Sequence, residues 1–104
     1  MPEIAYSFVP LGTVAGTSQH PLVQNRMYLD VGNSIGPGVL DHHQESGGED
    51  NPECTARLVF DKRDLVFKSY RFSAESVELV LHENPDFDCC ASAYLASCLI
   101  RDGV

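Results

Sequence analysis

Three short segments carry the residue types that bind metal ions: residues 28–32, 39–44 and 82–88, which read YLDVG, VLDHHQ and HENPDFD. Within them the candidate metal ligands are Asp30, His42, His82, Asp86 and Asp88. Carboxylates combined with neutral imidazoles suit Mn²⁺, and less distinctively Mg²⁺ or Zn²⁺. This set exceeds the needs of one ion and is about right for two ions that share a bridging carboxylate. A two-metal site activates water and holds the oxygens of a phosphoryl group during in-line displacement.

Each of these signals has an ordinary structural explanation when it is taken alone. A single Asp before a helix, such as Asp88, is usually a cap, and Asp30 shortly before Gly32 is typical of a turn. His20 lies in a polar loop, where we interpret it as a solvated histidine, and the adjacent Cys89 and Cys90 fit small packing residues of a helix. The joint occurrence of all three segments is what indicates a site.

The elements that must position these residues alternate between strands and helices. Hydrophobic patterns predict strands over 26–32, 39–43 and 76–83 and helices over 52–67 and 89–103. In the first helix Leu58, Leu65 and Val66 fall on one stripe, and in the second the stripe is Ala91, Leu95, Cys98 and Leu99. Such alternation favours an α/β fold with a parallel sheet covered by helices.

The remaining segments predict turns and loops. Residues 33–38 (NSIGPG) are typical of a turn, and residues 44–53 form a polar, glycine-rich loop. Residues 1–25 give a weaker signal, because 4–14 could form a strand while 15–25 is typical of a loop. In open α/β sheets, ligands bind beyond the carboxyl ends of the strands. We therefore expect the polar groups at three strand ends to converge at one sheet edge: Asp30, then Asp41 with His42 and His43, then His82 with Asp86 and Asp88.

Composition limits the class of protein. A chain of 104 residues with 43% hydrophobic residues fits one globular domain, residues 1–104. No apolar run approaches the roughly 18 residues of a membrane span, and the N-terminus lacks a secretory signal pattern. The four cysteines form no C-x-x-C pair, so we expect reduced, mostly buried thiols in a cytoplasmic protein. A net charge of −8 argues against a long nucleic acid as partner.

The joint pattern resembles the DHH phosphoesterase family of metal-dependent hydrolases. VLDHHQ is similar to the motif that names the family, LHENPDFDCCAS to its H-x-N-P-D-x-D motif, and YLDVGN to a third motif in which an Asp ends a strand. ECTARLVF resembles the helix that commonly follows the DHH motif. The matches cover roughly residues 26–104.

The resemblance implies a role for each matching position. Asp30, His42, His82, Asp86 and Asp88 would be the metal ligands, with Asp30 bridging two ions, Mn²⁺ by preference. Asp41 would orient the histidine pair, and His43 would face the substrate phosphate, so these two are the catalytic candidates. Ser92 would help to shape the phosphate pocket.

Two departures from the family pattern shape the functional prediction. The DHH motif precedes the H-x-N-P-D-x-D motif here, whereas the family has the opposite order, so we expect a circularly permuted domain. A fourth bridging Asp and a second, closing domain have no convincing match. We therefore expect either a fragment that lacks a C-terminal domain or a reduced domain that completes its site as a homo-oligomer.

The resulting prediction is a phosphohydrolase for a small phosphodiester or phosphoanhydride, such as a short oligonucleotide, a cyclic dinucleotide, pyrophosphate or polyphosphate. Without the four site aspartates, eleven acids face seven bases, a balance of −4. This mildly acidic remainder favours a small phosphorylated substrate. The alternatives are a non-catalytic metal- or nucleotide-binding module and a plain α/β interaction domain with accidental motifs.

Overall fold

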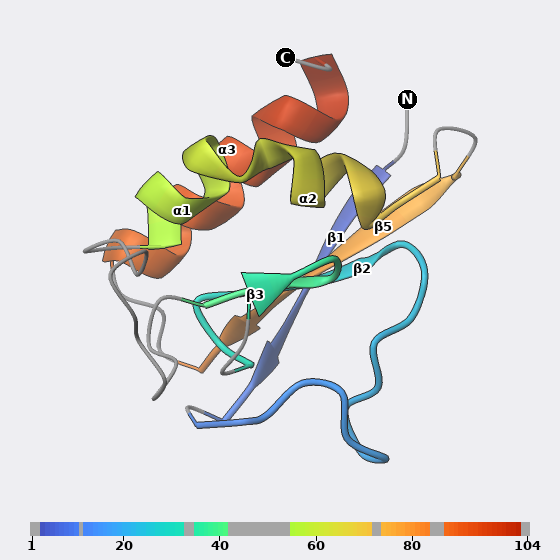
Figure 1. The fold of residues 1–104 in the computed structure, drawn as a ribbon, viewed down its shortest axis with the longest axis vertical. Coiled ribbons are helices and arrows are strands. Elements are labelled where there is room, and N and C mark those ends of the chain that lie inside the picture. The colour runs from blue at the N-terminus through green and yellow to red at the C-terminus, as the bar shows by residue number, and fades with distance from the viewer. Residues whose placement is uncertain are drawn as a thin grey trace.

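The chain folds into an α/β arrangement built on one five-stranded sheet (Figure 1). The computed structural model describes residues 3–10, 12–32, 35–41, 55–71, 74–83 and 87–102. Its strands are β1 (Glu3–Val9), β2 (Arg26–Leu29), β3 (Ile35–Gly36), β4 (Val39–Leu40) and β5 (Ser76–His82). Its helices are α1 (Thr55–Asp61), α2 (Arg63–Lys68) and α3 (Phe87–Asp102).

The sheet is mixed but mostly parallel. Its strand order is β1-β5-β2-β4-β3, in which the first four strands run parallel and β3 pairs antiparallel with β4. The prediction of an α/β fold with a parallel sheet is therefore confirmed for four strands. The turn predicted over 33–38 is confirmed at Pro37–Gly38, whereas Ile35–Gly36 pairs with Val39–Leu40 as a hairpin. Residues 33 and 34 lie outside the described residues. Gly38, with a φ of 88°, supplies the left-handed backbone that this tight reversal requires.

Two strands end earlier than their sequence patterns predict. β2 stops at Leu29 because Asp30 takes a φ of 62°, a left-handed conformation that interrupts a strand and that Asp tolerates better than most residues. β4 stops at Leu40, so Asp41 follows the strand and does not belong to it. His42 and His43 lie outside the described residues. The possible strand over 4–14 is confirmed only as far as Val9.

The helices also depart from the predicted ranges. The single helix predicted over 52–67 divides at Lys62, whose backbone φ of −113° and ψ of 36° separates α1 from α2. Leu58 and Val66 are nevertheless buried and Leu65 is half-buried, so the predicted stripe is correct. On α3 the predicted stripe is correct only at Leu99, because Ala91, Leu95 and Cys98 are half-buried. The other buried positions of this helix are Cys89, Ser92, Ala93, Ala96, Ser97 and Ile100.

The apolar core has two parts, one on each face of the sheet. The three helices lie together on one side of the sheet (Figure 1), and the larger cluster there includes Met27, Leu29, Leu79 and Leu99. The smaller cluster is Tyr28, Val31, Val39 and Val80, with Val9 and Ala15 packed against it. Successive residues of β2 thus contribute to different clusters, as expected for a strand that is buried on both faces.

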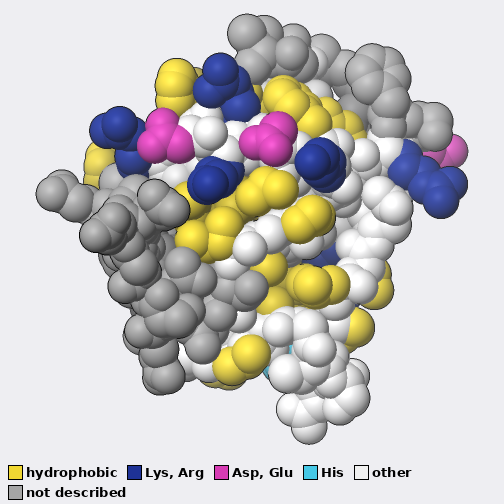
Figure 2. Space-filling view, viewed as in Figure 1, with side chains coloured by type: hydrophobic (Ala, Val, Ile, Leu, Met, Phe, Trp, Pro, Cys, Tyr) yellow, Lys and Arg dark blue, Asp and Glu magenta, His cyan; other side chains and the backbone are white. Residues whose placement is uncertain are grey.

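The surface over the helices mixes both signs of charge. In Figure 2 acidic side chains lie among basic ones along the upper part of the molecule, where Figure 1 places the helices. Arg57 pairs with Asp61 at 3.0 Å on α1, and Lys68 lies 3.9 Å from Asp64 on α2. Within the described residues, no helix has both the length and the apolar composition needed to cross a bilayer.

Candidate metal centre

Parallel pairing places three predicted site residues at the same edge of the sheet. β5, β2 and β4 are neighbours that run in the same direction. Their carboxyl ends carry His82 as the last residue of β5, Asp30 after β2 and Asp41 after β4. This placement agrees with part of the convergence expected from the sequence, and all three residues are buried. His42, His43 and Asp86, which belong to the same expectation, lie outside the described residues.

Asp30 and His82 are in direct contact. His82 Nε2 lies 3.1 Å from Asp30 Oδ2, and the two residues are only 4% and 1% exposed. The other ring nitrogen, Nδ1, lies 3.1 Å from the backbone oxygen of Glu83. A carbonyl oxygen can only accept a hydrogen bond, so this contact assigns the hydrogen to Nδ1. In a neutral ring, Nε2 then presents its lone pair toward the Asp30 carboxylate.

That arrangement favours a cation between the two side chains. A lone pair that faces a carboxylate oxygen at 3.1 Å is repulsive unless a proton or a metal ion lies between them. Histidines that bind metals commonly donate their other N–H to a backbone carbonyl, as the His82 ring does toward Glu83. The buried pair therefore has the orientation of a metal-binding histidine beside a carboxylate ligand.

Thr55, which the sequence analysis did not single out, joins two of the carboxylates. It is fully buried at the start of α1. Its hydroxyl donates to Asp30 Oδ1 at 2.8 Å, and its backbone N–H donates to Asp88 Oδ2 at 2.9 Å. A Thr directly before an apolar helical stretch is a typical N-terminal helix residue, and that signal could have drawn attention to it.

Asp88 and Ser92 have structural bonds in addition to their predicted roles. Asp88 is half-buried in the first turn of α3, and its carboxylate accepts the N–H of the first residue of α1. It therefore ties the starts of two helices together. Ser92 is fully buried and its hydroxyl donates to the backbone oxygen of Asp88 at 2.7 Å, a bond within the helix.

Cys89 is the second residue that the sequence analysis missed as a site candidate. Its sulfur, one side-chain oxygen of Asp30 and one ring nitrogen of His82 all lie within 4.8 Å of one another. The thiol is fully buried and contacts the backbone oxygen of Leu29 at 3.9 Å. The expectation of mostly buried thiols holds for Cys89, whereas Cys90 is exposed and Cys98 is half-buried.

Other predicted site residues cannot be placed against this cluster. His42, His43 and Asp86 lie outside the described residues. Asp41 is buried beside the sheet edge. Among the residues that the structure describes, the cluster thus comprises Asp30, His82 and Cys89, with Thr55 and Asp88 attached to it by hydrogen bonds.

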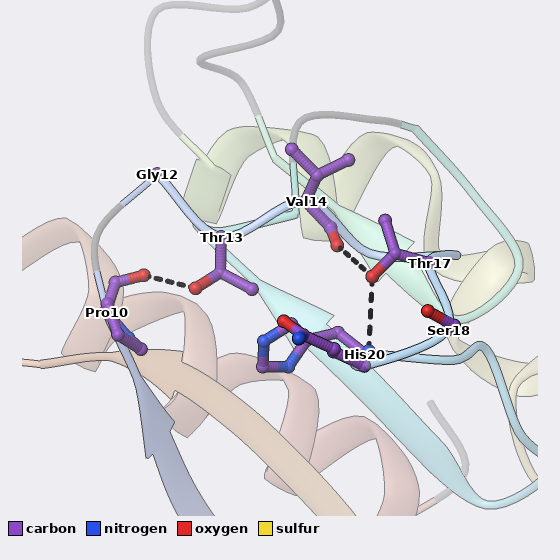
Figure 3. Close-up of a pocket in the computed structure, with 8 residues that line it drawn as sticks. Pro10, Gly12, Thr13, Val14, Thr17, Ser18 and His20 are labelled. Atoms are coloured by element: carbon purple, nitrogen blue, oxygen red, sulfur yellow. Dashed lines mark hydrogen bonds between the residues drawn. The ribbon is translucent and has the colours of Figure 1, made fainter.

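A shallow hollow of about 510 Å³ follows β1 (Figure 3). It begins at Pro10, directly after Val9, which pairs with His82 across the sheet. His20 lines it and is half-buried, not fully solvated as the sequence suggested. The Thr13 hydroxyl donates to Pro10 at 2.6 Å, and the Thr17 hydroxyl accepts the His20 N–H at 3.2 Å. These hydroxyls mainly hold the loop in shape.

Comparison with known proteins yields no relatives. No protein-family profile matches the sequence, and no curated protein or solved structure is significantly similar to the chain.

Proposed function

We propose that this chain is the metal-binding domain of a divalent-metal-dependent phosphohydrolase, with a DHH-like architecture in permuted order. The observation that carries the proposal is the buried contact between Asp30 and His82 where parallel strands end. Asp41 at the adjacent strand end and the link from Thr55 to Asp88 support it. The three motifs that resemble the family supply the rest of the argument.

The donor set suits the metal that the family resemblance implies. Carboxylate oxygens with imidazole nitrogen fit Mn²⁺, and Mg²⁺ or Zn²⁺ less distinctively. In the proposed site Asp30 and His82 hold metal together with Asp88 and with His42 and Asp86, which lie outside the described residues. When bound, a pair of such ions would activate water and neutralise charge on the phosphoryl group.

The protein's own groups then have separate tasks. The Glu83 carbonyl fixes the His82 ring through Nδ1, and Thr55 fixes the Asp30 carboxylate through Oδ1. Asp41 orients the histidine pair, His43 contacts the substrate phosphate, and Ser92 shapes the pocket. Residues held by such secondary bonds keep their orientation when substrate binds.

A small phosphodiester or phosphoanhydride is the proposed substrate. The net charge of −8 would repel a long nucleic acid. Among the described residues on the face in Figure 2, acidic side chains lie between basic ones. The proposal also places the protein in the cytoplasm, with a further domain or a second copy completing the site.

The test is hydrolysis by the full chain in the presence of Mn²⁺ and, in separate assays, of Mg²⁺ or Zn²⁺. Bis-p-nitrophenyl phosphate, pyrophosphate and a dinucleotide are offered separately, and product is measured. We expect turnover of at least one of them, abolished by EDTA and by Asp30→Asn. Asp64→Asn, which removes an exposed carboxylate on α2, is the matched control and should retain activity. Failure to turn over any of the three would contradict the proposal.

The alternative is a metal- or nucleotide-binding module without catalysis. It is favoured by the bond of the Asp88 carboxylate to the start of α1, which gives that residue a structural task. The missing match to a fourth bridging Asp points the same way. Mn²⁺ binding in calorimetry, together with no turnover of any substrate, would identify this alternative.

A further inference from the structure

The Asp30, His82 and Cys89 cluster combines three ligand chemistries at one buried point. The three residues come from the end of β2, the end of β5 and the start of α3. Their ligand atoms lie within 4.8 Å of one another, and each residue is less than 5% exposed. An oxygen, a nitrogen and a sulfur meeting at the sheet edge is a specific arrangement, because three separate elements must bring them together.

We propose that Cys89 is a metal ligand alongside Asp30 and His82, and that the site therefore prefers Zn²⁺ or Co²⁺ to Mn²⁺ or Mg²⁺. Thiolate ligands favour zinc, whereas manganese and magnesium favour oxygen. Three protein ligands leave a fourth tetrahedral position for water or substrate, as in catalytic zinc sites. The inference concerns the ligand set alone and stands whether or not the protein hydrolyses phosphate esters.

The distances fit a tetrahedral ion. Bonds of about 2.0–2.1 Å to nitrogen or oxygen place two such ligands roughly 3.3 Å apart, and a sulfur bond of about 2.3 Å places sulfur roughly 3.6 Å from them. The observed separation of Asp30 Oδ2 and His82 Nε2 is 3.1 Å. The Cys89 sulfur lies within 4.8 Å of the other two ligand atoms, so it must move closer by at most about 1.2 Å to reach the ideal separation, which a side-chain rotation can supply.

The His82 ring supports the same assignment. Nδ1 points at the Glu83 oxygen, so the lone pair of Nε2 points at Asp30 in the neutral ring. A positive charge there, either a metal ion or the proton of a charged His82 ring, turns the repulsion between the Nε2 lone pair and the Asp30 carboxylate into attraction. The Cys89 sulfur contacts the Leu29 backbone oxygen at 3.9 Å, a weak bond that a metal–sulfur bond is strong enough to replace.

The chain contains a matched control for this proposal. Cys90 is adjacent to Cys89 and exposed, so replacing it removes a thiol outside the cluster. With four cysteines in the chain, the triple variant C54S/C90S/C98S keeps Cys89 as its sole thiol. C89S therefore tests whether the Cys89 sulfur is necessary for metal binding through a thiolate, and C54S/C90S/C98S tests whether it is sufficient.

The test is Co²⁺ binding by the reduced full chain, followed by absorption spectroscopy. We expect thiolate-to-cobalt charge-transfer absorption in the wild type, in C90S and in the triple variant. C89S should lose this absorption and bind Co²⁺ more weakly by about tenfold or more, since even outer contacts of metal sites contribute about 10–100-fold. Zn²⁺ should displace the cobalt signal, whereas equal concentrations of Mn²⁺ or Mg²⁺ should not.

A second measurement does not depend on whether C89S folds. X-ray absorption of the zinc-loaded triple variant should show one sulfur at about 2.3 Å from the metal. A shell of only oxygen and nitrogen would overturn the proposal, as would cobalt charge transfer that persists in C89S or is missing from the wild type. Loss of phosphodiester turnover with an intact cobalt–sulfur signal would reject the proposed activity and leave this site standing.

Discussion

Thr55 links two carboxylates through two different atoms. Its hydroxyl holds Asp30 and its backbone N–H holds Asp88, at 2.8 and 2.9 Å. We expect Thr55→Val, which preserves shape but removes the hydroxyl, to lower the free energy of unfolding by about 1–3 kcal/mol, because a buried carboxylate loses a donor. Urea unfolding measures the change, with metal-free protein.

Thr55→Ser is the matched control for that prediction. It keeps the hydroxyl and removes only a methyl group, so its loss should be about 1 kcal/mol, the cost of a small cavity. Equal losses in the Val and Ser variants would show that packing, and not the bond to Asp30, accounts for the burial of Thr55.

Glu78 should make the free energy of unfolding depend on pH, independently of the metal cluster. Its carboxylate accepts bonds from Ser7 on β1 at 2.7 Å and from Arg26 on β2 at 2.6 Å. Partial burial acts to raise the Glu78 pKa, but the hydrogen bonds from Ser7 and Arg26 and the Arg26 charge outweigh it, and the pKa lies below its ordinary value of 4.5.

The sign of the effect follows from this lowered pKa. A carboxylate with a lower pKa in the folded state stabilises the fold above pH 4.5. The stabilisation disappears as the pH falls through the folded-state pKa. We expect the unfolding free energy of the wild type to drop over this acidic range more steeply than that of Glu78→Gln. Identical pH profiles from urea unfolding would contradict this, and Glu75→Gln, a carboxylate on the approach to β5, serves as the control.

At the scale of elements, Gly32 controls how the chain leaves β2. It has a φ of 113°, and an added Cβ would lie 2.7 Å from Val39 Cγ2 and 3.1 Å from the Ala15 Cβ. The residue also accepts the Ala15 N–H at 3.1 Å, which fastens the following loop to the strand end. Both the backbone conformation and the space therefore require glycine.

The change Gly32→Ala should lower the free energy of unfolding by about 2–4 kcal/mol, from backbone strain and overpacking together. Gly12→Ala isolates the first term, since Gly12 has a φ of 90° with nothing within 4 Å of an added Cβ. We expect that control to lose only about 1–2 kcal/mol. Chemical denaturation of both variants makes the comparison, and equal losses would exclude a role for the Val39 contact.

Local sequence patterns decide which strands and helices could be predicted from the sequence. β2, β5 and α3 carry apolar runs bounded by polar or turn residues, so their existence was predictable, and with it the positions of Asp30 and His82. β1 is an edge strand with an irregular burial pattern, and its extent was not predictable. The pairing of Ile35–Gly36 with Val39–Leu40 was not predictable, because a two-residue strand is too short to show an alternating pattern beside the turn residues Pro37 and Gly38.

The part of the site that lies at the ends of parallel strands could be predicted from the sequence. Parallel pairing brings Asp30, Asp41 and His82 to one edge, and that follows from alternating strands and helices. Thr55 and Cys89 were missed because their positions depend on where α1 and α3 begin in space. Helix packing, and not sequence spacing, sets those starts.

At the scale of the whole molecule, the cluster joins elements that would separate on unfolding. Asp30 follows β2, His82 ends β5 and Cys89 lies on α3, and these elements pair or pack directly with one another. An unfolded chain does not hold the three ligands together, so an ion binds the folded state selectively. Metal binding should then stabilise the entire domain, and not only the edge of the sheet.

The last prediction measures that coupling by thermal unfolding in Zn²⁺ and in Mn²⁺. An ion at a concentration one hundred times its Kd stabilises the fold by about 2.7 kcal/mol, which for a domain of this size raises Tm by roughly 10–20 °C. His82→Gln should remove most of this shift, whereas Asp61→Asn, an exposed carboxylate on α1, should retain it. Because the cluster includes a thiol, the shift at equal concentration should be larger with Zn²⁺ than with Mn²⁺. A Tm that responds equally to the ions in wild type and His82→Gln would place metal binding elsewhere in the protein.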